Sequence, residues 1–236
     1  MPAQPSLAQV LANDLHTTEA SGTLTIDNLS LWRRFGSDRR HMPAEELFRQ
    51  GGLPHGVYFI GSGYVKLSAV DQDGRELIVG LRGAGVVLGV PAVILQEAYH
   101  VSAVAITDCE SHYMSAESFI PLLKADPRFS WFILREQSNQ VYRQLTHILQ
   151  LGFYSARKRL CQLLWHLLSS TEARQHQEGT YLQLPLKQWE VAQLIAVTPE
   201  HLNRIVKEMQ QQGILQWTKG TITVFDSKRL RDSITA

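Results

Sequence analysis

The stretch Leu186-Lys-Gln-Trp-Glu-Val-Ala-Gln-Leu-Ile-Ala-Val-Thr-Pro-Glu-His-Leu-Asn-Arg-Ile205 has the pattern of two short helices joined by a tight turn. Apolar residues from Val191 to Ile195 recur at helical spacing and form one side of the first helix. Thr198 is a helix N-cap residue, and Pro199 suits the first position of the second helix. The sequence therefore predicts a helix-turn-helix.

The second predicted helix has an apolar face and a polar face. The apolar stripe comprises Leu202, Ile205, Val206 and Met209. The polar face carries Glu200, His201, Asn203, Arg204 and Lys207. Long or hydrogen-bonding side chains on one helix face suit the base edges in the major groove of DNA. An ordinary helical hairpin with a solvated polar face fits the same pattern, so this segment alone leaves both interpretations open.

The residues that follow favour the first interpretation. Gly213 ends the helix at a position where glycine is common. The β-rich runs 214–217 and 221–225 flank Lys219-Gly220, which is a hairpin turn signal. A helix-turn-helix followed by a hairpin is a winged helix. We expect the wing to place Lys219 near a phosphate backbone, where its charge adds affinity that does not depend on sequence.

Length and charge fit a DNA-binding domain joined to a second domain. The chain has 236 residues, 44% of them hydrophobic, and a net charge of +1. Residues 154–236 carry 11 Lys and Arg against 7 Asp and Glu, a net charge of +4. Residues 1–153 carry 12 against 15, a net charge of −3. A basic end beside an acidic remainder is typical of a DNA-binding domain attached to a sensor.

The cysteines and the apolar runs set the expected compartment. Cys109 and Cys161 lie in mostly apolar runs and are expected to be buried thiols. Two cysteines cannot supply the four thiolates of a typical iron–sulfur cluster. The first residues lack a signal peptide, and no run reaches the roughly 18 apolar residues of a membrane span. We expect a reduced, cytoplasmic protein that does not contact a membrane.

The middle of the chain has the texture of an antiparallel β-structure. Short apolar or β-branched runs alternate with glycine turns, and Asp73-Gly74 is a two-residue hairpin turn. The predicted strands are 57–60, 64–70, 76–81, 101–107 and 110–114. Many short strands at this spacing predict a small barrel or roll. The expected fold class is α+β, with an N-terminal antiparallel β-roll and a C-terminal winged helix.

After Pro127, a long stretch free of glycine and proline separates the two parts. Residues 127–151 predict one helix of about 25 residues, or about 37 Å. Its apolar residues suggest a seam for a second copy of the chain, with Val141, Leu145 and Ile148 at its centre. The alternative is a seam that packs on its own domain. The sequence thus predicts a homodimer.

The predicted hinge and domain bounds follow from this helix. Gly152 and Tyr154-Ser155 form the expected hinge, and a new helix over 155–169 starts with Arg157-Lys158-Arg159. A polar loop is expected over 175–179. The predicted domains are a sensor barrel over 1–125, a dimerisation helix and hinge over 126–153, and a DNA-binding domain over 154–236. No role is assigned to residues 1–40.

The combined order of barrel, long helix and winged helix resembles the superfamily of the catabolite activator and the fumarate–nitrate regulator (CRP/FNR). The resemblance covers about residues 42–225. It rests on Pro43-Ala-Glu-Glu-Leu-Phe-Arg-Gln-Gly-Gly52, Val57-Tyr-Phe-Ile-Gly-Ser-Gly-Tyr-Val-Lys-Leu67, Asp73-Gly-Arg-Glu-Leu-Ile78, Gly83-Ala-Gly85 and Leu184-Pro-Leu186. It implies a transcription regulator with a cyclic-nucleotide-binding-like domain. The implied partners are double-stranded DNA and RNA polymerase.

The resemblance also assigns roles on the second helix. The family's recognition helix carries a Glu and, four residues later, an Arg, which match Glu200 and Arg204. An Arg can pair with guanine in two bonds and a Glu can accept from cytosine, and positions four apart share a helix face. A surface ion pair between the two is the plainer alternative, and both roles can coexist. Gln188 and Thr198 complete the expected DNA interface.

Four departures from the family pattern bear on this interface. Pro199 stands where the catabolite-activator branch has an additional base-reading Arg, and Asn203 stands where the FNR branch often has Ser. We therefore expect a DNA half-site that is related to those of the family but not identical to either. Ala196 replaces the usual glycine of the turn. Lys187 replaces a capping Thr, so that helix start is expected to be capped otherwise or weakly.

The sensor domain departs from the cyclic-AMP pattern. The family's Gly-Glu-Leu turn, whose Glu holds the ribose, reads Gly89-Val90-Pro91 here, and the Arg-Ser pair that holds the phosphate falls near Tyr99-His100. No Arg occurs between Arg82 and Arg128, and a buried phosphate without a cation is costly. We expect an effector pocket near Val90, Tyr99 and His100 that takes a small molecule other than cyclic AMP, or none.

Two further chemistries are lesser alternatives. His100 or His112, with Met114, could hold a haem, although such residues are more often ordinary barrel side chains. We assign no cofactor and no metal. A barrel-based ligand-binding or metal-dependent enzyme module, with a C-terminal domain that makes only protein contacts, is the alternative function. No His-x-His, Ser/His/Asp or phosphate-loop pattern supports catalysis, so an enzyme is not expected.

Overall fold

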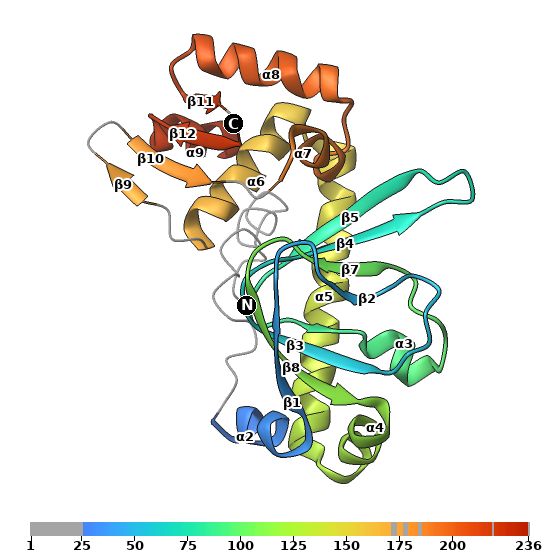
Figure 1. Ribbon diagram of the computed structural model, residues 1–236. Helices are drawn as coiled ribbons and strands as arrows, with labels where there is room; N and C mark the ends of the chain where they lie inside the picture. Colours follow the sequence, from blue (N-terminus) through green and yellow to red (C-terminus); the bar gives the residue numbers. More distant parts are fainter. Residues whose placement is uncertain (1–25, 171–173, 177–178, 184–185, 219, 236) are drawn as a thin grey trace, which may run out of the picture. The chain divides into compact units, whose positions relative to one another are not determined.

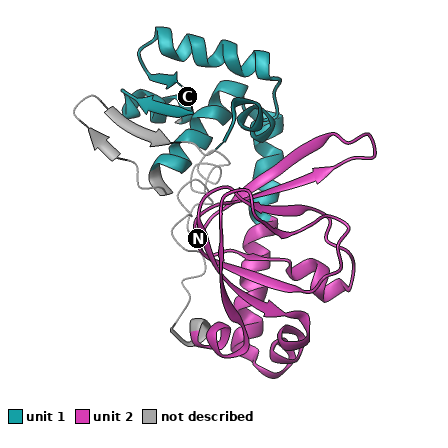
Figure 2. Cartoon of the chain, viewed as in Figure 1, with its two compact units in different colours: residues 1–19, 142–236 teal, residues 20–141 magenta. Residues whose placement is uncertain are grey.

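The computed structural model describes residues 26–170, 174–176, 179–183, 186–218 and 220–235 (Figure 1). Internal contacts divide the described chain into two compact units (Figure 2). The first in chain order lies before the boundary between Val141 and Tyr142 and is magenta (unit 2 in the key), and the second lies after it and is teal (unit 1 in the key). The boundary between Val141 and Tyr142 falls inside one long helix. The structure thus gives two units, whereas the sequence predicts a third segment made of the long helix and the hinge.

The first unit is built from two four-stranded antiparallel sheets. Their orders are β1-β8-β3-β6 and β2-β7-β4-β5. The strands are β1 Ser37–His41, β2 Glu46–Phe48, β3 Gly56–Ser62, β4 Val65–Val70, β5 Glu76–Arg82, β6 Val87–Leu88, β7 Ser102–Ala105 and β8 Cys109–Ser115. Three helices accompany them, α2 Ile26–Phe35, α3 Val90–Leu95 and α4 Ala116–Ala125. The predicted α+β class and antiparallel roll are confirmed. Strands β1, β2 and β6 and helices α3 and α4 had no sequence prediction.

The β4–β5 hairpin turns where the sequence predicts, but the connection spans residues 71–75, so the predicted two-residue Asp73-Gly74 turn is wrong in its length. The Asp71 carboxylate accepts hydrogen bonds from the backbone N–H groups of Asp73 and Arg75, at 2.9 and 2.8 Å. Gly74 has φ of 80°, a conformation that glycine adopts without steric cost. The turn pairs Val70 with Glu76, so alternate residues of the two strands face the same side.

Two apolar clusters form the core of this unit, one on each side of β3. Val57 and Phe59 belong to the cluster on the helix side, with Trp32, Phe119 and Phe129. The intervening residues Tyr58 and Ile60 belong to the other cluster, inside the roll, with Val65, Leu67 and Leu88 as neighbours. Because successive strand residues point to opposite faces, one strand of apolar residues contributes to both clusters. This explains why β3 is apolar along its length instead of alternating.

Helix α5 runs from Pro127 to Phe153, two residues beyond the predicted end. Phe129, Phe132 and Ile133 are buried in the helix-side cluster of the roll. Gly152 lies inside the helix, so its prediction as a hinge residue is wrong. The break falls at Tyr154 and Ser155. The Ser155 hydroxyl accepts a 3.2 Å bond from the backbone N–H of Lys158 and so caps the next helix.

The second unit contains the helix-turn-helix and a four-stranded sheet of order β11-β12-β10-β9. Its elements are α6 Ala156–Ser170, β9 Arg174–His176, β10 Gly179–Gln183, α7 Gln188–Leu194, α8 Pro199–Gln211, β11 Leu215–Thr218, β12 Thr221–Val224 and α9 Ser227–Thr235. A polar loop was predicted over 175–179. Both ends of that range lie in strands instead, since residues 175 and 176 belong to β9 and Gly179 begins β10. Helix α9 was not predicted. None of the described helices is long and apolar enough to span a membrane.

Candidate nucleic-acid interface

The turn between α7 and α8 is tight and holds a residue in a rare conformation. Ala196 has φ of 52°, in the left-handed region, which costs a residue with a Cβ about 1–2 kcal/mol. The N–H of Ala196 donates to the carbonyl of Gln193, and the N–H of Val197 donates to the carbonyl of Ala192, both at 2.9 Å. These bonds end α7 and turn the chain toward α8.

Helix α7 begins without the usual side-chain cap, as we expected from the Lys at position 187. Lys187 occupies the cap position, and a lysine side chain has no acceptor atom. The buried Glu190 compensates, because its carboxylate accepts a 2.8 Å bond from the backbone N–H of Lys187. Gln188, the first residue of α7, is exposed, as a contact with DNA requires.

Helix α8 begins with the predicted cap. The Thr198 hydroxyl accepts a 3.3 Å bond from the backbone N–H of His201, and Pro199 occupies the first turn. Hydrogen bonds from its own backbone N–H and from the Thr198 side chain lower the pKa of the Glu200 carboxyl. Glu200 is therefore an anion at neutral pH, able to accept hydrogen bonds from a base edge.

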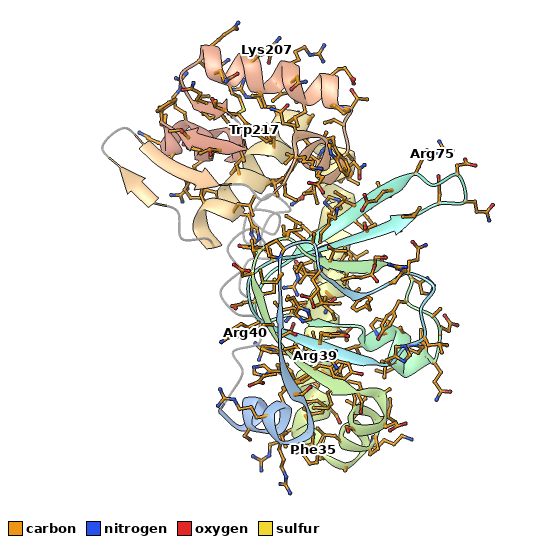
Figure 3. The ribbon with its side chains drawn as sticks, viewed as in Figure 1. Phe35, Arg39, Arg40, Arg75, Lys207 and Trp217 are labelled. Carbon is orange, nitrogen blue, oxygen red and sulfur yellow. The ribbon has the colours of Figure 1, made fainter. Side chains whose placement is uncertain are left out.

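The two faces of α8 are as the spacing predicted. Leu202, Ile205, Val206 and Met209 are all buried. Glu200, Asn203, Arg204 and Lys207 are exposed, and His201 is half-buried. In Figure 3, Lys207 projects from the side of α8 opposite Trp217 of β11. Within the described chain no ion pair joins Glu200 to Arg204, so both side chains are available to a ligand.

The hairpin after α8 supports the helix on its buried side. Gly213 ends α8 with φ of 66°. Strands β11 and β12 pair Thr218 with Thr221 and Trp217 with Ile222, and the side chains of Trp217 and Ile222 are buried. Gly220 has φ of 83° in the turn. Lys219 lies outside the described residues, so its place near a phosphate backbone stays a prediction.

Two guanidinium groups hold the last turn of α8. Arg229 of α9 donates a 2.9 Å bond to the backbone carbonyl of Gln212, and Arg157 of α6 donates a 2.5 Å bond to its side-chain oxygen. Positive charge is favourable at a helix C-terminus. Sequence reasoning missed this support because it missed α9, although a signal exists. The Asp226 carboxylate caps α9 by accepting a 2.8 Å bond from the N–H of Arg229.

The predicted dimerisation residues are exposed on α5. Val141, Leu145 and Ile148 keep 55%, 55% and 62% of their surface accessible. This contradicts the alternative in which the seam packs on its own domain. Trp131 and Leu134, also exposed, continue the seam at the same spacing of three and four residues. An apolar stripe this long on one helix points to a partner surface.

The three residues assigned to an effector pocket have different environments. Val90 is buried in the helix-side cluster. Tyr99 is buried, and its hydroxyl donates a 2.7 Å bond to the carbonyl of Gly56. His100 is exposed and lies 3.5 Å from the Glu97 carboxylate. The pocket stays a prediction.

The residues considered for a haem are engaged in the fold. Met114 is fully buried in the helix-side cluster. His112 donates from Nδ1 to the Asp38 carboxylate, and its ring stacks on the Phe59 ring with the two centroids 6.1 Å apart. Among the described residues, no group of three or more His, Cys, Asp or Glu side chains has the arrangement of a metal site. The cysteines are buried as predicted, and burial raises the pKa of Cys161 to about 11.

Comparisons with known proteins agree with both halves of this architecture. The family described as "Cyclic nucleotide-binding domain" matches residues 38–126, and the family described as "Crp-like helix-turn-helix domain" matches residues 158–233. The cAMP-activated global transcriptional regulator CRP of Haemophilus influenzae is 26% identical over 174 residues, 73% of this chain and 76% of that protein. The CRP-like protein Clp of Xanthomonas campestris is 27% identical over 217 residues, 89% of this chain and 94% of its own.

Solved structures show the same fold. The c-di-GMP-responsive global regulator CLP of Xanthomonas campestris superposes with a TM-score of 0.74 at 24% identity, and the match covers 86% of this chain and all of that one. A transcriptional regulator of the CRP family from Thermus thermophilus has a TM-score of 0.73 at 18% identity, covering 84% of this chain and 97% of that one.

Proposed function

Because the chain belongs to the CRP/FNR superfamily of transcription regulators, we propose that it acts as a homodimer that reads a palindromic DNA site through α8. We propose further that a small molecule other than cyclic AMP controls it. Its DNA contacts are Glu200, Arg204, His201, Asn203 and Lys207 on α8, with Gln188 and Thr198 at the two helix starts.

The exposed polar face of α8 is the observation that carries this proposal. The opposite face of the helix packs into the core of the unit, which leaves the exposed side chains for a partner. Arg204 and Glu200 are four residues apart and project from the same face. A guanidinium there can give two parallel bonds to guanine O6 and N7, and the adjacent carboxylate can accept from cytosine N4.

The homodimer follows from the exposed seam of α5. Trp131, Leu134, Val141, Leu145 and Ile148 repeat at intervals of three, four and seven residues, which is the spacing of a two-helix coiled coil. Burying this stripe against a second copy removes apolar surface from water. Two copies related by a two-fold axis would present two α8 helices to two half-sites, which is why the target should be palindromic.

The effector proposal rests on Val90. A cyclic AMP site of the family needs a carboxylate on the ribose at this place. Val90 instead belongs to the buried apolar cluster that also contains Phe119 and Val93. The name of the Haemophilus influenzae regulator says that cAMP activates it, and CLP of Xanthomonas campestris is described as responsive to c-di-GMP. We propose that this chain responds to a small molecule other than cyclic AMP. A binding test should include both cyclic AMP and c-di-GMP.

Selection of bound sequences from random double-stranded DNA tests the function. The purified full chain should enrich two inverted half-sites whose centres lie about one helical turn apart. A matched variant, Arg204→Ala, should enrich the same spacing with a relaxed base preference. Failure to enrich any sequence, with binding that matches bulk DNA, would reject the regulator assignment. Mass analysis of small molecules that co-purify with the chain would identify the effector.

A further inference from the structure

The start of α6 holds a guanidinium that bridges two separate parts of the second unit. Arg159 donates from Nε to the carbonyl of Ile195 at 2.8 Å and from Nη1 to the carbonyl of Tyr154 at 2.6 Å. Its third nitrogen, Nη2, lies 3.4 Å from the carbonyl oxygen of Ala196. One side chain therefore contacts the residue that follows α5 and the turn between α7 and α8.

Each acceptor is a backbone carbonyl that its own helix leaves without a partner. Tyr154 comes directly after α5, and Ile195 and Ala196 come directly after α7. The last carbonyls of a helix have no intrahelical donor and carry the negative end of the helix dipole. A guanidinium matches such a group of oxygens better than an ammonium does, because its donors form a fixed planar fork.

We propose that Arg159 is a positioning residue for DNA reading, which ties the turn of the helix-turn-helix to the end of α5. It acts through Ala196, the turn residue whose φ of 52° is unfavourable for any residue with a Cβ. Arg159 bonds the carbonyls on both sides of that conformation and so holds it. The inference rests on the proposed function, since the helix it positions is the one proposed to read DNA.

Other features of the site indicate that Arg159 holds the turn in place and does not serve as a cation for a DNA phosphate. Arg159 is half-buried, and burial lowers the pKa of its guanidinium. The neighbouring Lys158 also fixes the hinge residue, because its Nζ lies 4.2 Å from the centroid of the Tyr154 ring. A cation placed for a phosphate would instead be expected to project into solvent, as Lys207 does (Figure 3).

Amide hydrogen exchange of the free protein tests the clamp without DNA. The N–H of Val197 donates to Ala192 across the turn, so its exchange reports the turn. We expect Arg159→Met to raise that exchange rate at least tenfold, while the amide of Val206 inside α8 changes less than twofold. The control is Arg231→Met, which removes the same charge from an arginine that lies over the Trp165 ring. It should leave the exchange rates of the Val197 and Val206 amides unchanged. Unchanged exchange in Arg159→Met would overturn the proposal.

Binding to the selected DNA site gives the second test. Arg159→Met should weaken binding at least tenfold with the salt dependence of the wild type. A slope lower by about one unit would instead make Arg159 a phosphate contact and reject the proposal. In the background of Ala196→Gly, which relieves the left-handed strain, the same change should cost threefold or less. An equal loss in both backgrounds would also reject it.

The exchange measurement can fail or succeed independently of the proposed function. Wild-type protein that binds no DNA specifically would reject the function, while the exchange measurement would still decide the clamp. If Arg159→Met does not fold by circular dichroism, Arg159→Lys replaces it, because it keeps the charge and the stem but loses the fork. The exchange rate of the Val197 amide should then exceed the wild-type rate at least threefold, and a wild-type rate would count against the clamp.

Discussion

The side-chain amide of Gln140 in α5 donates a 2.9 Å hydrogen bond to the backbone carbonyl of Val87 in β6. Strand β6 is the last strand of its sheet, so this carbonyl has no further strand to bond with. Val87 lies two residues before Gly89, where the chain turns into α3 with φ of 87°. Gln140 lies beside Val141 of the exposed seam. One bond thus connects the turn next to the expected effector pocket with the expected dimer interface.

Loss of this bond should weaken the first unit. Gln140→Met removes the donor and leaves a partly buried carbonyl unpaired, so we expect the free energy of unfolding to fall by about 1–3 kcal/mol. Gln144→Met makes the same change at an exposed position of α5 and should shift it by about 0.5 kcal/mol or less. Urea unfolding followed by circular dichroism compares the two. Equal losses would show that the Val87 bond contributes nothing specific.

Charges in the seam of α5 should produce monomers. Replacing both Val141 and Leu145 with Glu places like charges against each other across the two-fold axis, where apolar contact should otherwise stabilise association. Each half-site then loses its tethered partner, and DNA binding weakens. Light scattering at micromolar concentration should give a dimer for the wild type. The control Leu53→Glu with Leu95→Glu alters two exposed leucines outside α5 and should stay dimeric; a wild-type monomer contradicts the interface.

Cyclic AMP should not bind at physiological concentration. A phosphate site without a cation, beside a valine in place of the ribose-binding carboxylate, leaves charged oxygens without partners. Titration calorimetry should therefore give a Kd no tighter than about 1 mM, or about −4 kcal/mol. The cAMP-activated regulator of Haemophilus influenzae serves as the positive control. A micromolar Kd for this chain would require another anion-binding group near Tyr99 and His100.

Acid should destabilise the second unit through His166. Burial, and then the nearby Arg143 charge, lower the pKa of His166. In the unfolded chain a histidine has a pKa of about 6.5, so below that pH the unfolded state binds a proton that the folded state does not. Stability should therefore fall as the pH drops from about 7 toward 5. His166→Gln should flatten the dependence of Tm on pH, with pH 8 as the reference where both forms are neutral; an unchanged slope would assign the acid sensitivity elsewhere.

Local signals predicted the elements that carry function. The cap at Thr198, the apolar stripe that begins at Leu202 and the position of the β4–β5 hairpin each depend on neighbours a few residues away, so one sequence suffices to find them. The length of the hairpin connection, five residues instead of two, was not found. Helix α5 was predicted within two residues because no glycine or proline interrupts it before Gly152. Gly152 itself misled the prediction, since an isolated glycine costs a helix only about 1 kcal/mol, which an intact helix tolerates.

Contacts between distant segments were beyond reach of the sequence. The bond from Arg159 to Ile195 joins residues 36 positions apart. Gln212 accepts one bond from Arg157, 55 positions before it, and one from Arg229, 17 positions after it. Short strands such as β1 have exposed charged residues and no apolar alternation, so their pairing with β8 decides their conformation. The predicted effector pocket also depends on contacts of this kind and stays a prediction. Val90, Tyr99 and His100 are close in sequence, yet packing gives each a different environment.

Base reading by α8 gives the last prediction. Arg204→Ala should cost about 1–3 kcal/mol per half-site and relax preference at one base pair, because a guanidinium bound to guanine in two bonds supplies that discrimination. Lys219→Ala, chosen from the sequence, should weaken binding to every variant alike and lower the salt slope by about one unit. Affinities for single-base variants of the selected site, measured at several salt concentrations, separate the two roles. Base-independent loss from Arg204→Ala, together with altered base preference from Lys219→Ala, would reverse the assignments and reject α8 as the helix that reads the groove.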